Sequence, residues 1–340
     1  MSETQISLTS CYPCSGVDSQ ILLECSNEYF ATNLRFNDDL HYEVLEKLIE
    51  PSASGIIVSS GQAALALALI TLRISGHRSI GIDEMSYPHA ITLCSSLGFK
   101  IFKLKENNNT GEFERLIKYG CRLFYLMPQM HNPRGTYLSS IEVQNIASLI
   151  ERSGSIVIED AAYAHISNNQ SSFLDYLKNQ TFKIKSLTKM ISNRLHAGLL
   201  EYPSLYKEIV LKTRTRYGFG VSPHSICVIN CIIKKGLLER LIEAKRQEGF
   251  VRKKLAFDLA GITVTNGWYS MVELPCEGST FTRALRAYGV TVSPGSAFHI
   301  DSAPTNSIRI SLGGETNRSR LAEGLRRLGK LLNNYHNSIE

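Results

Sequence analysis

Short apolar runs alternate with helix-forming segments from about residue 55 to residue 190, and this alternation constrains the fold more than any other feature. The runs of strand length cover residues 54–59, 79–83, 99–104, 121–127 and 155–160, with helical patterns between them. Strands that alternate with helices favour parallel pairing, with helices on both faces of one sheet. The sequence therefore predicts an α/β fold with a mainly parallel, doubly wound sheet.

The pattern changes after residue 198. A long, largely helical stretch covers residues 222–259, and strand and helix patterns then alternate over residues 270–274, 280–288, 307–312 and 318–332. We expect a smaller α+β domain here. The predicted organisation is an N-terminal arm at 1–50, a large domain at 51–225 and a small C-terminal domain at 226–340. Within the arm, residues 1–40 show little periodicity and suggest short extended pieces, whereas 41–49 has helical spacing.

Composition narrows the class of protein. The chain has 340 residues, 43% hydrophobic and 20% charged, as in an ordinary globular protein. Its net charge of +6 is spread along the chain, which argues against a nucleic-acid partner. The longest apolar run, residues 63–70, is too short to span a bilayer, and the first residues lack signal-peptide character. We expect a cytoplasmic protein without a membrane partner, with its eight cysteines mostly reduced.

Cys11 and Cys14 form a Cys-x-x-Cys pair near the N-terminus. Such a pair is half of a zinc or redox site, or else two unrelated thiols. No second pair of this kind occurs in the sequence, so no metal is predicted.

Residues 181–189 end in Ser186-x-x-Lys189, where a short β-like run enters a turn rich in small and polar residues. A lysine held away from bulk water there loses its proton more easily and can form a Schiff base. The alternative is an ordinary solvated lysine in a loop.

Other polar residues also stand after strands. Ser60-Gly61-Gln62 lies between a strand and a strong helix former, where free N–H groups and the positive end of the helix dipole face an anion. A plain N-cap is the alternative. Tyr87, at a strand-to-helix turn, either covers a ligand ring or packs in the core. Asp160 ends an apolar strand, where it caps the next turn or meets a ligand.

The loop after residues 121–127 contains Asn132-Pro133-Arg134-Gly135, whose proline and glycine fix its course. We expect Asn132 to face the carboxyl end of the preceding strand.

Taken in order, these features resemble those of fold-type I pyridoxal-phosphate enzymes, in particular the class I/II aminotransferases. The likeness covers about residue 55 to the C-terminus. It rests on Ser60-Gly61-Gln62, Tyr87, Asn132-Pro133-Arg134-Gly135, Asp160-x-x-Tyr163, Ser186-x-x-Lys189 and the segment around Arg309. The implied large domain has the pyridoxal-phosphate transferase fold type I.

The resemblance implies pyridoxal 5'-phosphate as cofactor and Lys189, Asp160 and Tyr163 as catalytic residues. Lys189 would carry the cofactor as a Schiff base and move the proton at the substrate Cα. Asp160 would keep the pyridine nitrogen protonated, which makes the ring an electron sink. Asn132 and Tyr163 would hydrogen-bond the phenolic oxygen.

The resemblance also assigns the two ends of the site. Phosphate would be held by Ser60, Gly61, Gln62 and Ser186, with Tyr87 stacked on the ring. Arg309 would grip the substrate α-carboxylate with a bidentate pair. The family's phosphate-binding arginine comes seven or eight residues after the lysine. Here Arg194 comes five residues after it and His196 seven, and either is a candidate.

A second likeness links residues 59–64, 186–189 and 309–315 to the trans-sulfuration lyases and synthases. In those enzymes a tyrosine and an arginine of the partner subunit reach the phosphate, a role open to Arg35 or Tyr42. The Asn-Pro-x-Gly and Asp-x-x-Tyr motifs favour the aminotransferases.

Three functions are compatible with these residues. The leading one is amino-group transfer from a free α-amino acid to a keto acid, by a homodimer as in the family, in specialised amino-acid metabolism or biosynthesis. The alternative keeps the cofactor but performs elimination, replacement, cyclisation or decarboxylation. The third is a non-catalytic sensor of pyridoxal phosphate. The sequence shows no helix-turn-helix pattern before residue 55, so we do not expect the sensor function.

Overall fold

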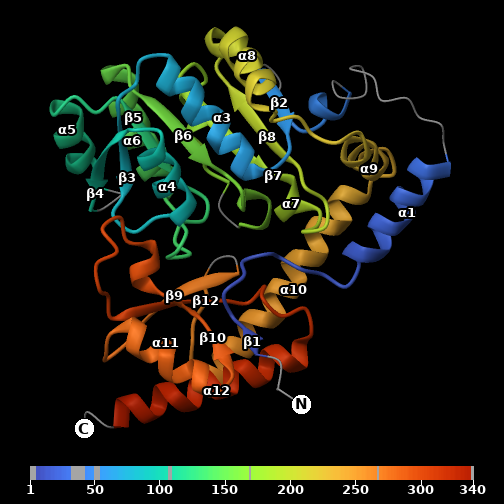
Figure 1. The fold of residues 1–340 in the computed structure, drawn as a ribbon, viewed down its shortest axis with the longest axis vertical. Helices are drawn as coiled ribbons and strands as arrows, with labels where there is room; N and C mark the ends of the chain where they lie inside the picture. Colours follow the sequence, from blue (N-terminus) through green and yellow to red (C-terminus); the bar gives the residue numbers. More distant parts are fainter. Residues whose placement is uncertain are drawn as a thin grey trace.

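The computed structural model describes residues 5–31, 43–49, 54–105, 109–167, 170–265 and 268–337. Its centre is a seven-stranded sheet with the strand order β2-β8-β7-β6-β5-β3-β4 (Figure 1). The strands are β2 (Ser54–Val58), β3 (Ser79–Asp83), β4 (Lys100–Leu104), β5 (Leu123–Leu126), β6 (Ile156–Asp160), β7 (Thr181–Ser186) and β8 (Gly198–Tyr202). Among the described strands of this sheet, β8 runs in the direction opposite to the other six. The predicted mainly parallel sheet is thus confirmed.

Helices cover both faces of this sheet. One face packs against α3 (Gly61–Ile74), α4 (Pro88–Ser96) and α8 (Lys207–Tyr217). The other packs in part against α5 (Thr110–Lys118) and α6 (Ser140–Ser153) and in part against α9 (Pro223–Lys234). Successive side chains of a strand point to opposite faces. In β6, accordingly, Ile156 and Ile158 join the first core and Val157 joins the second.

The C-terminal part is smaller and lies at the bottom of Figure 1. Its three-stranded antiparallel sheet has the order β11 (Ser293–Pro294), β12 (Ser307–Ser311), β9 (Tyr269–Glu273). Helices α11 (Gly278–Ala287) and α12 (Arg318–Asn337) pack with it, and α10 (Leu237–Ala260) leads into it from the large sheet. The N-terminal β1 (Ile6–Ser7) joins this part by parallel pairing with β10 (Val290–Thr291).

Short elements complete the described chain. They are α7 (Leu187–Met190) and the 3-10 turns η1 (Ala164–Ile166), η2 (Phe173–Asp175), η3 (Ser204–Tyr206) and η4 (Gly295–Phe298). Within the described ranges, no helix is both long and apolar enough to cross a bilayer.

Three elements differ from the sequence expectation. The N-terminal arm, expected as extended pieces, contains α1 (Asp18–Ala31), because Ile21, Leu22 and Cys25 bury one side of it in the core that contains α9. Strand β8 and helix α8 were not expected at all. Of the helix expected at 41–49, residues 43–49 are described and 43–46 are helical.

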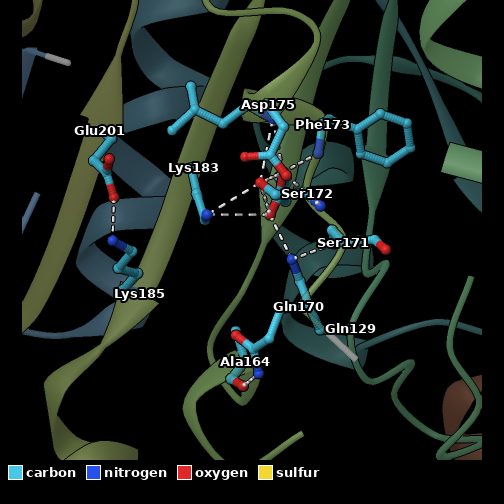
Figure 2. A network of polar contacts seen from close by, with 12 residues as sticks. Gln129, Ala164, Gln170, Ser171, Ser172, Phe173, Asp175, Lys183, Lys185 and Glu201 are labelled. Carbon is cyan, nitrogen blue, oxygen red and sulfur yellow. Dashed lines mark hydrogen bonds and ion pairs between the residues drawn. The ribbon is translucent and has the colours of Figure 1, made fainter. Parts of the chain in front are cut away.

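A buried carboxylate fixes the sheet on the face opposite Ile158. Glu159, in β6, is fully buried and accepts hydrogen bonds at 2.8 Å from the Gln129 side chain, the Ser172 hydroxyl and the Phe173 amide. Lys183, in β7, donates to the Ser172 hydroxyl at 3.0 Å, and its ammonium lies 3.8 Å from Glu159 (Figure 2). These contacts tie β6 and β7 to the loop after β5 and to the start of η2.

Removing this carboxylate will test its contribution to stability. Glu159→Ala leaves Lys183 as an uncompensated buried charge and removes the acceptor of several buried donors, so we expect the free energy of unfolding to fall by about 3 kcal/mol. Urea denaturation monitored by circular dichroism measures it. The control is Glu208→Ala, which breaks the exposed ion pair with Lys212 and should leave the urea midpoint unchanged. Equal midpoints for the two variants would contradict the role of Glu159.

Candidate functional site

A cavity of about 350 Å³ opens at the carboxyl ends of β2, β5, β6 and β7. Ligands in open α/β sheets bind at this edge. The predicted site residues that line it are Ser60, Gly61, Gln62, Tyr87, Asn132, Asp160, Tyr163, Ser186, Lys189, His196 and Arg309. Arg194 is exposed and is not one of the lining residues, so of the two phosphate candidates only His196 lies at the cavity. Arg35 and Tyr42 lie outside the described residues.

Lys189 stands on α7, directly after β7. Ser186 caps this turn, and its hydroxyl accepts the Lys189 amide at 3.4 Å. Burial lowers the pKa of Lys189 to about 8, although the nearby Asp160 carboxylate opposes this shift. The Lys189 ammonium nitrogen lies 3.3 Å from the centroid of the Tyr12 ring and 5.4 Å from that of Tyr163. The amine is therefore desolvated and surrounded by aromatic surface.

Asp160 ends β6 on the cavity side of the sheet. Its carboxylate accepts the Tyr125 hydroxyl at 2.5 Å and the Ala162 amide at 3.0 Å. Burial raises the pKa of Asp160, while these two hydrogen bonds and the Lys189 charge oppose the rise. Tyr125 was not among the predicted site residues, because within the apolar strand β5 it has the pattern of a core residue. The Asp160 carboxyl group is thus held in a fixed position at the cavity.

The N-terminus of α3 lines the cavity. Ser60 is the N-cap, and its hydroxyl accepts the Ala63 amide at 3.0 Å. The first amides of a helix have no partner within the helix and attract an anion. A Cβ at Gly198 would lie 2.3 Å from the Ser60 carbonyl carbon. Glycine at the start of β8 thus allows the strand to press against this turn and fix it.

Tyr87 precedes α4 and lines the cavity, with its hydroxyl accepting the Gln62 side-chain NH₂ at 2.8 Å. Burial raises the pKa of Tyr87. This hydrogen bond links two predicted cofactor-binding residues, Gln62 in the first turn of α3 and Tyr87 just before α4.

Arg309 comes from β12, in the small sheet. Its guanidinium donates to Asn132 Oδ1 and to the Thr9 carbonyl, each at 2.8 Å. The side chain is buried and its Nε has no partner among the described residues. A buried arginine N–H without an acceptor is costly, and a carboxylate supplies such an acceptor. Arg309 and Asn132, far apart in sequence, thus form one wall of the cavity.

The N-terminal segment supplies lining residues that the sequence did not indicate. They are Ser10, Cys11 and Tyr12. The Tyr163 hydroxyl donates to the Cys11 carbonyl at 2.8 Å, so Tyr163 holds the N-terminal segment by a hydrogen bond. No periodicity or motif in the N-terminal segment predicted that it lines the cavity. The position of the segment depends on contacts with residues hundreds of positions away in sequence.

Cys11 and Cys14 are both free thiols, Cys11 buried and Cys14 partly buried. Among the residues that the structure describes, no three His, Cys, Asp or Glu side chains gather as a metal site.

Comparison with known families gives a match to the family model described as aminotransferase class I and II, over residues 26–202. This span includes every predicted site residue except Arg309.

Among curated proteins, the chain is 29% identical over 290 residues to the uncharacterized HTH-type transcriptional regulator YdeF of Bacillus subtilis, an alignment that covers 82% of this chain and 62% of that protein. It is 23% identical over 306 residues to the HTH-type transcriptional regulator NorG of Staphylococcus aureus, covering 84% of this chain and 68% of NorG. The chain spans less than two thirds of the length of the Bacillus relatives YdeF and YisV.

Among solved structures, an archaeal alanine:glyoxylate aminotransferase superposes with a TM-score of 0.86 at 20% identity, covering 98% of this chain and 92% of that one. The α-aminoadipate aminotransferase LysN of Thermus thermophilus, complexed with N-(5'-phosphopyridoxyl)-L-leucine, superposes with a TM-score of 0.86 at 18% identity. The superposition covers 99% of this chain and 94% of LysN. These likenesses establish the fold.

The lowered pKa of Lys189 predicts a distinctive pH profile. Only the uncharged amine attacks an aldehyde, so trapping of an aromatic aldehyde at Lys189 should reach half its maximal rate near pH 8. A solvent-exposed lysine titrates near about 10.4. Borohydride trapping and peptide mass spectrometry would give the rate at each pH, with the Lys212 peptide as exposed reference. In Asp160→Asn the midpoint should fall further, because the carboxylate that favours the ammonium is gone. A Lys189 profile identical to that of Lys212 would refute the desolvated amine.

Proposed function

This chain belongs to the aminotransferase class I and II family, and from that premise we propose that it is a pyridoxal phosphate-dependent aminotransferase acting on a free α-amino acid. One observation carries the proposal. A single cavity holds a desolvated lysine, a buried carboxylate, a helix N-terminus and a buried arginine, contributed by both sheets. In this proposal the amino donor is an α-amino acid and the acceptor is a keto acid.

The side chains around the cavity fit pyridoxal 5'-phosphate, the cofactor of the family. The N-terminal amides of α3, with the Ser60 and Ser186 hydroxyls, offer donors for the phosphate. Asp160 would pair with the protonated ring nitrogen of the cofactor, and Lys189 would bond to its aldehyde. Among the described lining residues, Arg309 is the one arginine, so the phosphate end relies on neutral donors, the helix dipole and His196.

When bound, pyridoxal phosphate supplies an aldehyde that bonds to amino groups and a ring that withdraws electrons from the substrate Cα. The chain supplies the remaining parts. With a pKa near 8, Lys189 is partly uncharged at neutral pH, so its Nζ can take the Cα proton and hold it. Asp160 is held at the cavity by the Tyr125 hydroxyl and the Ala162 amide, and as a carboxylate it would stabilise a positive ring nitrogen there more strongly than in water.

Arg309 and Asn132 orient the substrate. The Arg309 side chain lines the cavity and is held by Asn132 and the Thr9 carbonyl, and we propose that its guanidinium binds the substrate α-carboxylate. Asn132 uses its Oδ1 to hold Arg309, which leaves its NH₂ group as a donor for the cofactor's phenolic oxygen. Tyr163 is proposed to support the same oxygen, although its hydroxyl donates to Cys11 in this structure. These contacts set the orientation of the Cα bonds.

A second function is favoured by the names of the relatives. YdeF and NorG are HTH-type transcriptional regulators, and each matches more than four fifths of this chain. The same cavity would then serve a regulator, binding the cofactor and an amino acid without turnover. A third outcome, elimination or decarboxylation, uses the same groups, because the bond that breaks depends on its orientation to the ring.

Spectroscopy separates these functions. We expect purified, cofactor-loaded protein, titrated with single amino acids and no keto acid, to lose its visible cofactor band and release one keto acid per site. Binding spectra without any product would favour the regulator. Release of ammonia or carbon dioxide would favour a lyase. Lys189→Ala is the control, since it should form no borohydride-stable adduct with the cofactor. Protein that takes up no cofactor would overturn the proposal.

Asp160→Asn tests the role of the buried charge. The amide keeps the size of the carboxylate but not its charge, and an NH₂ donor replaces one of the two oxygens that accept the Tyr125 hydroxyl and the Ala162 amide. We expect the exchange of the substrate Cα proton to slow by roughly 10²-fold or more. Proton NMR in deuterium oxide measures this exchange, with cofactor content checked by absorbance. Asp258→Asn, an exposed residue of α10, is the matched control and should exchange at the wild-type rate. Near-normal exchange in Asp160→Asn would contradict the assigned role.

A further inference from the structure

The N-terminal residues 7–14, which we call the strap, run from β1 along the cavity toward α1 (Figure 1). Side chains from the rest of the chain bind their backbone carbonyls one after another. Arg309 binds the Thr9 carbonyl at 2.8 Å, Ser311 that of Ser10, Tyr163 that of Cys11 at 2.8 Å and Lys245 that of Pro13 at 2.9 Å. The strap is therefore held along its length by both parts of the molecule.

The turn after β12 closes on the strap from the other side. A Cβ added at Gly313 would lie 2.3 Å from the Tyr12 carbonyl oxygen, and one added at Gly314 would lie 2.1 Å from that of Ser7. Only glycine allows backbones to approach so closely. Because the backbone at Tyr12 is enclosed in this way, its ring cannot withdraw from the cavity by a shift of the strap.

The strap touches both groups that an amino acid would bridge. The Tyr12 ring centroid is 3.3 Å from the Lys189 ammonium nitrogen, and the Thr9 carbonyl is 2.8 Å from the guanidinium of Arg309. A ligand whose amino group reaches Lys189 and whose carboxylate reaches Arg309 therefore lies alongside the strap. Tyr12 has the largest side chain of the strap, and it lines the cavity.

Uncharged residues make up most of the described cavity lining, among them Cys11, Met130 and Tyr163. The basic side chains of this described lining are Lys189, Arg309 and His196. In the proposed function the first two serve the amino and carboxylate groups, and His196 is a candidate contact of the phosphate. Among these described lining residues, no further cation is left for a second carboxylate.

We propose that Tyr12 determines the substrate side chain, and that its ring restricts the cavity to small, uncharged amino acids. The inference rests on the proposed function, because it needs Lys189 and Arg309 as the two ends of the amino-acid site. The ring fills space beside Lys189 that a longer side chain would need. Tyr12 thus acts as a specificity-determining residue contributed by the N-terminal segment.

The test is a set of binding constants. Alanine and phenylalanine are titrated into cofactor-loaded wild type and Tyr12→Ala, and each Kd is read from the visible spectrum rather than from turnover. We expect the ratio of the two Kd values to shift toward phenylalanine by about 10-fold or more in Tyr12→Ala, as when a pocket gains room for a few methylene groups. Tyr12→Phe keeps the ring and should keep the wild-type ratio.

Two further variants keep the test decisive. Tyr12→Trp should weaken phenylalanine binding further, and gives a reading if the alanine variant fails to load cofactor. Cys14→Ala changes the strap outside the cavity and should leave the ratio unchanged. Hydrogen exchange of the Leu8 amide, which donates to Thr291 at 2.8 Å, shows in cofactor-free protein whether the strap stays docked.

The outcomes distinguish the two proposals. If wild type takes up cofactor and amino acids but Tyr12→Ala, with its strap docked, keeps the wild-type ratio, the role of Tyr12 is refuted and the proposed function stands. Tighter binding of glutamate than of alanine by wild type would also overturn the inference. If wild type takes up no cofactor, both proposals fall together.

Discussion

Parallel strands of one sheet must end at the same edge, and the site depends on this constraint. Strands β2, β5, β6 and β7 place Ser60, Asn132, Asp160 and Lys189 around one cavity, although these residues span more than a hundred positions. Each lies at the end of its strand or within a few residues of it, so the sheet rather than the loops sets most of the spacing. Strand β8 returns antiparallel between β2 and β7, and its first glycine presses on the Ser60 turn. The anion end of the cavity is thereby fixed from two sides.

Carboxyl groups lie on both faces of β6, and taking such groups out of water costs free energy. Asp160 faces the cavity and Glu159 faces away, and both carboxylates are surrounded by donors. An isolated charge is expensive in such a place, whereas a hydrogen-bonded one is tolerated. The network around Glu159 is purely internal. The groups at the cavity differ from it, because Lys189 has a lowered pKa and the Nε of Arg309 has no partner among the residues that the structure describes.

The same cavity is compatible with a transferase and with the ligand-binding part of a regulator. The family match and the structural likenesses come from aminotransferases, whereas YdeF and NorG are named as regulators. Both uses require the cofactor and the amino acid to be held in place. They differ in whether the Cα proton moves, which depends on alignment within the cavity. Tyr12 and the strap bear on either use, since they lie where the amino acid would bind.

The sequence by itself determined the alternation of strands and helices, and with it the sheet and the edge at which Lys189 and Asp160 meet. Periodicity of 2 or 3.6 residues and the residues at strand ends are local signals, which is why they are readable in a single chain. The sequence also identified Arg309 by resemblance, but its contacts with Asn132 and Thr9 were decided by the docking of the two sheets. Helix α1, strand β8 and the strap were missed for a related reason. Their places depend on packing partners far along the chain, such as α9 for α1 and the Gly313 turn for Tyr12, and no local pattern encodes such contacts.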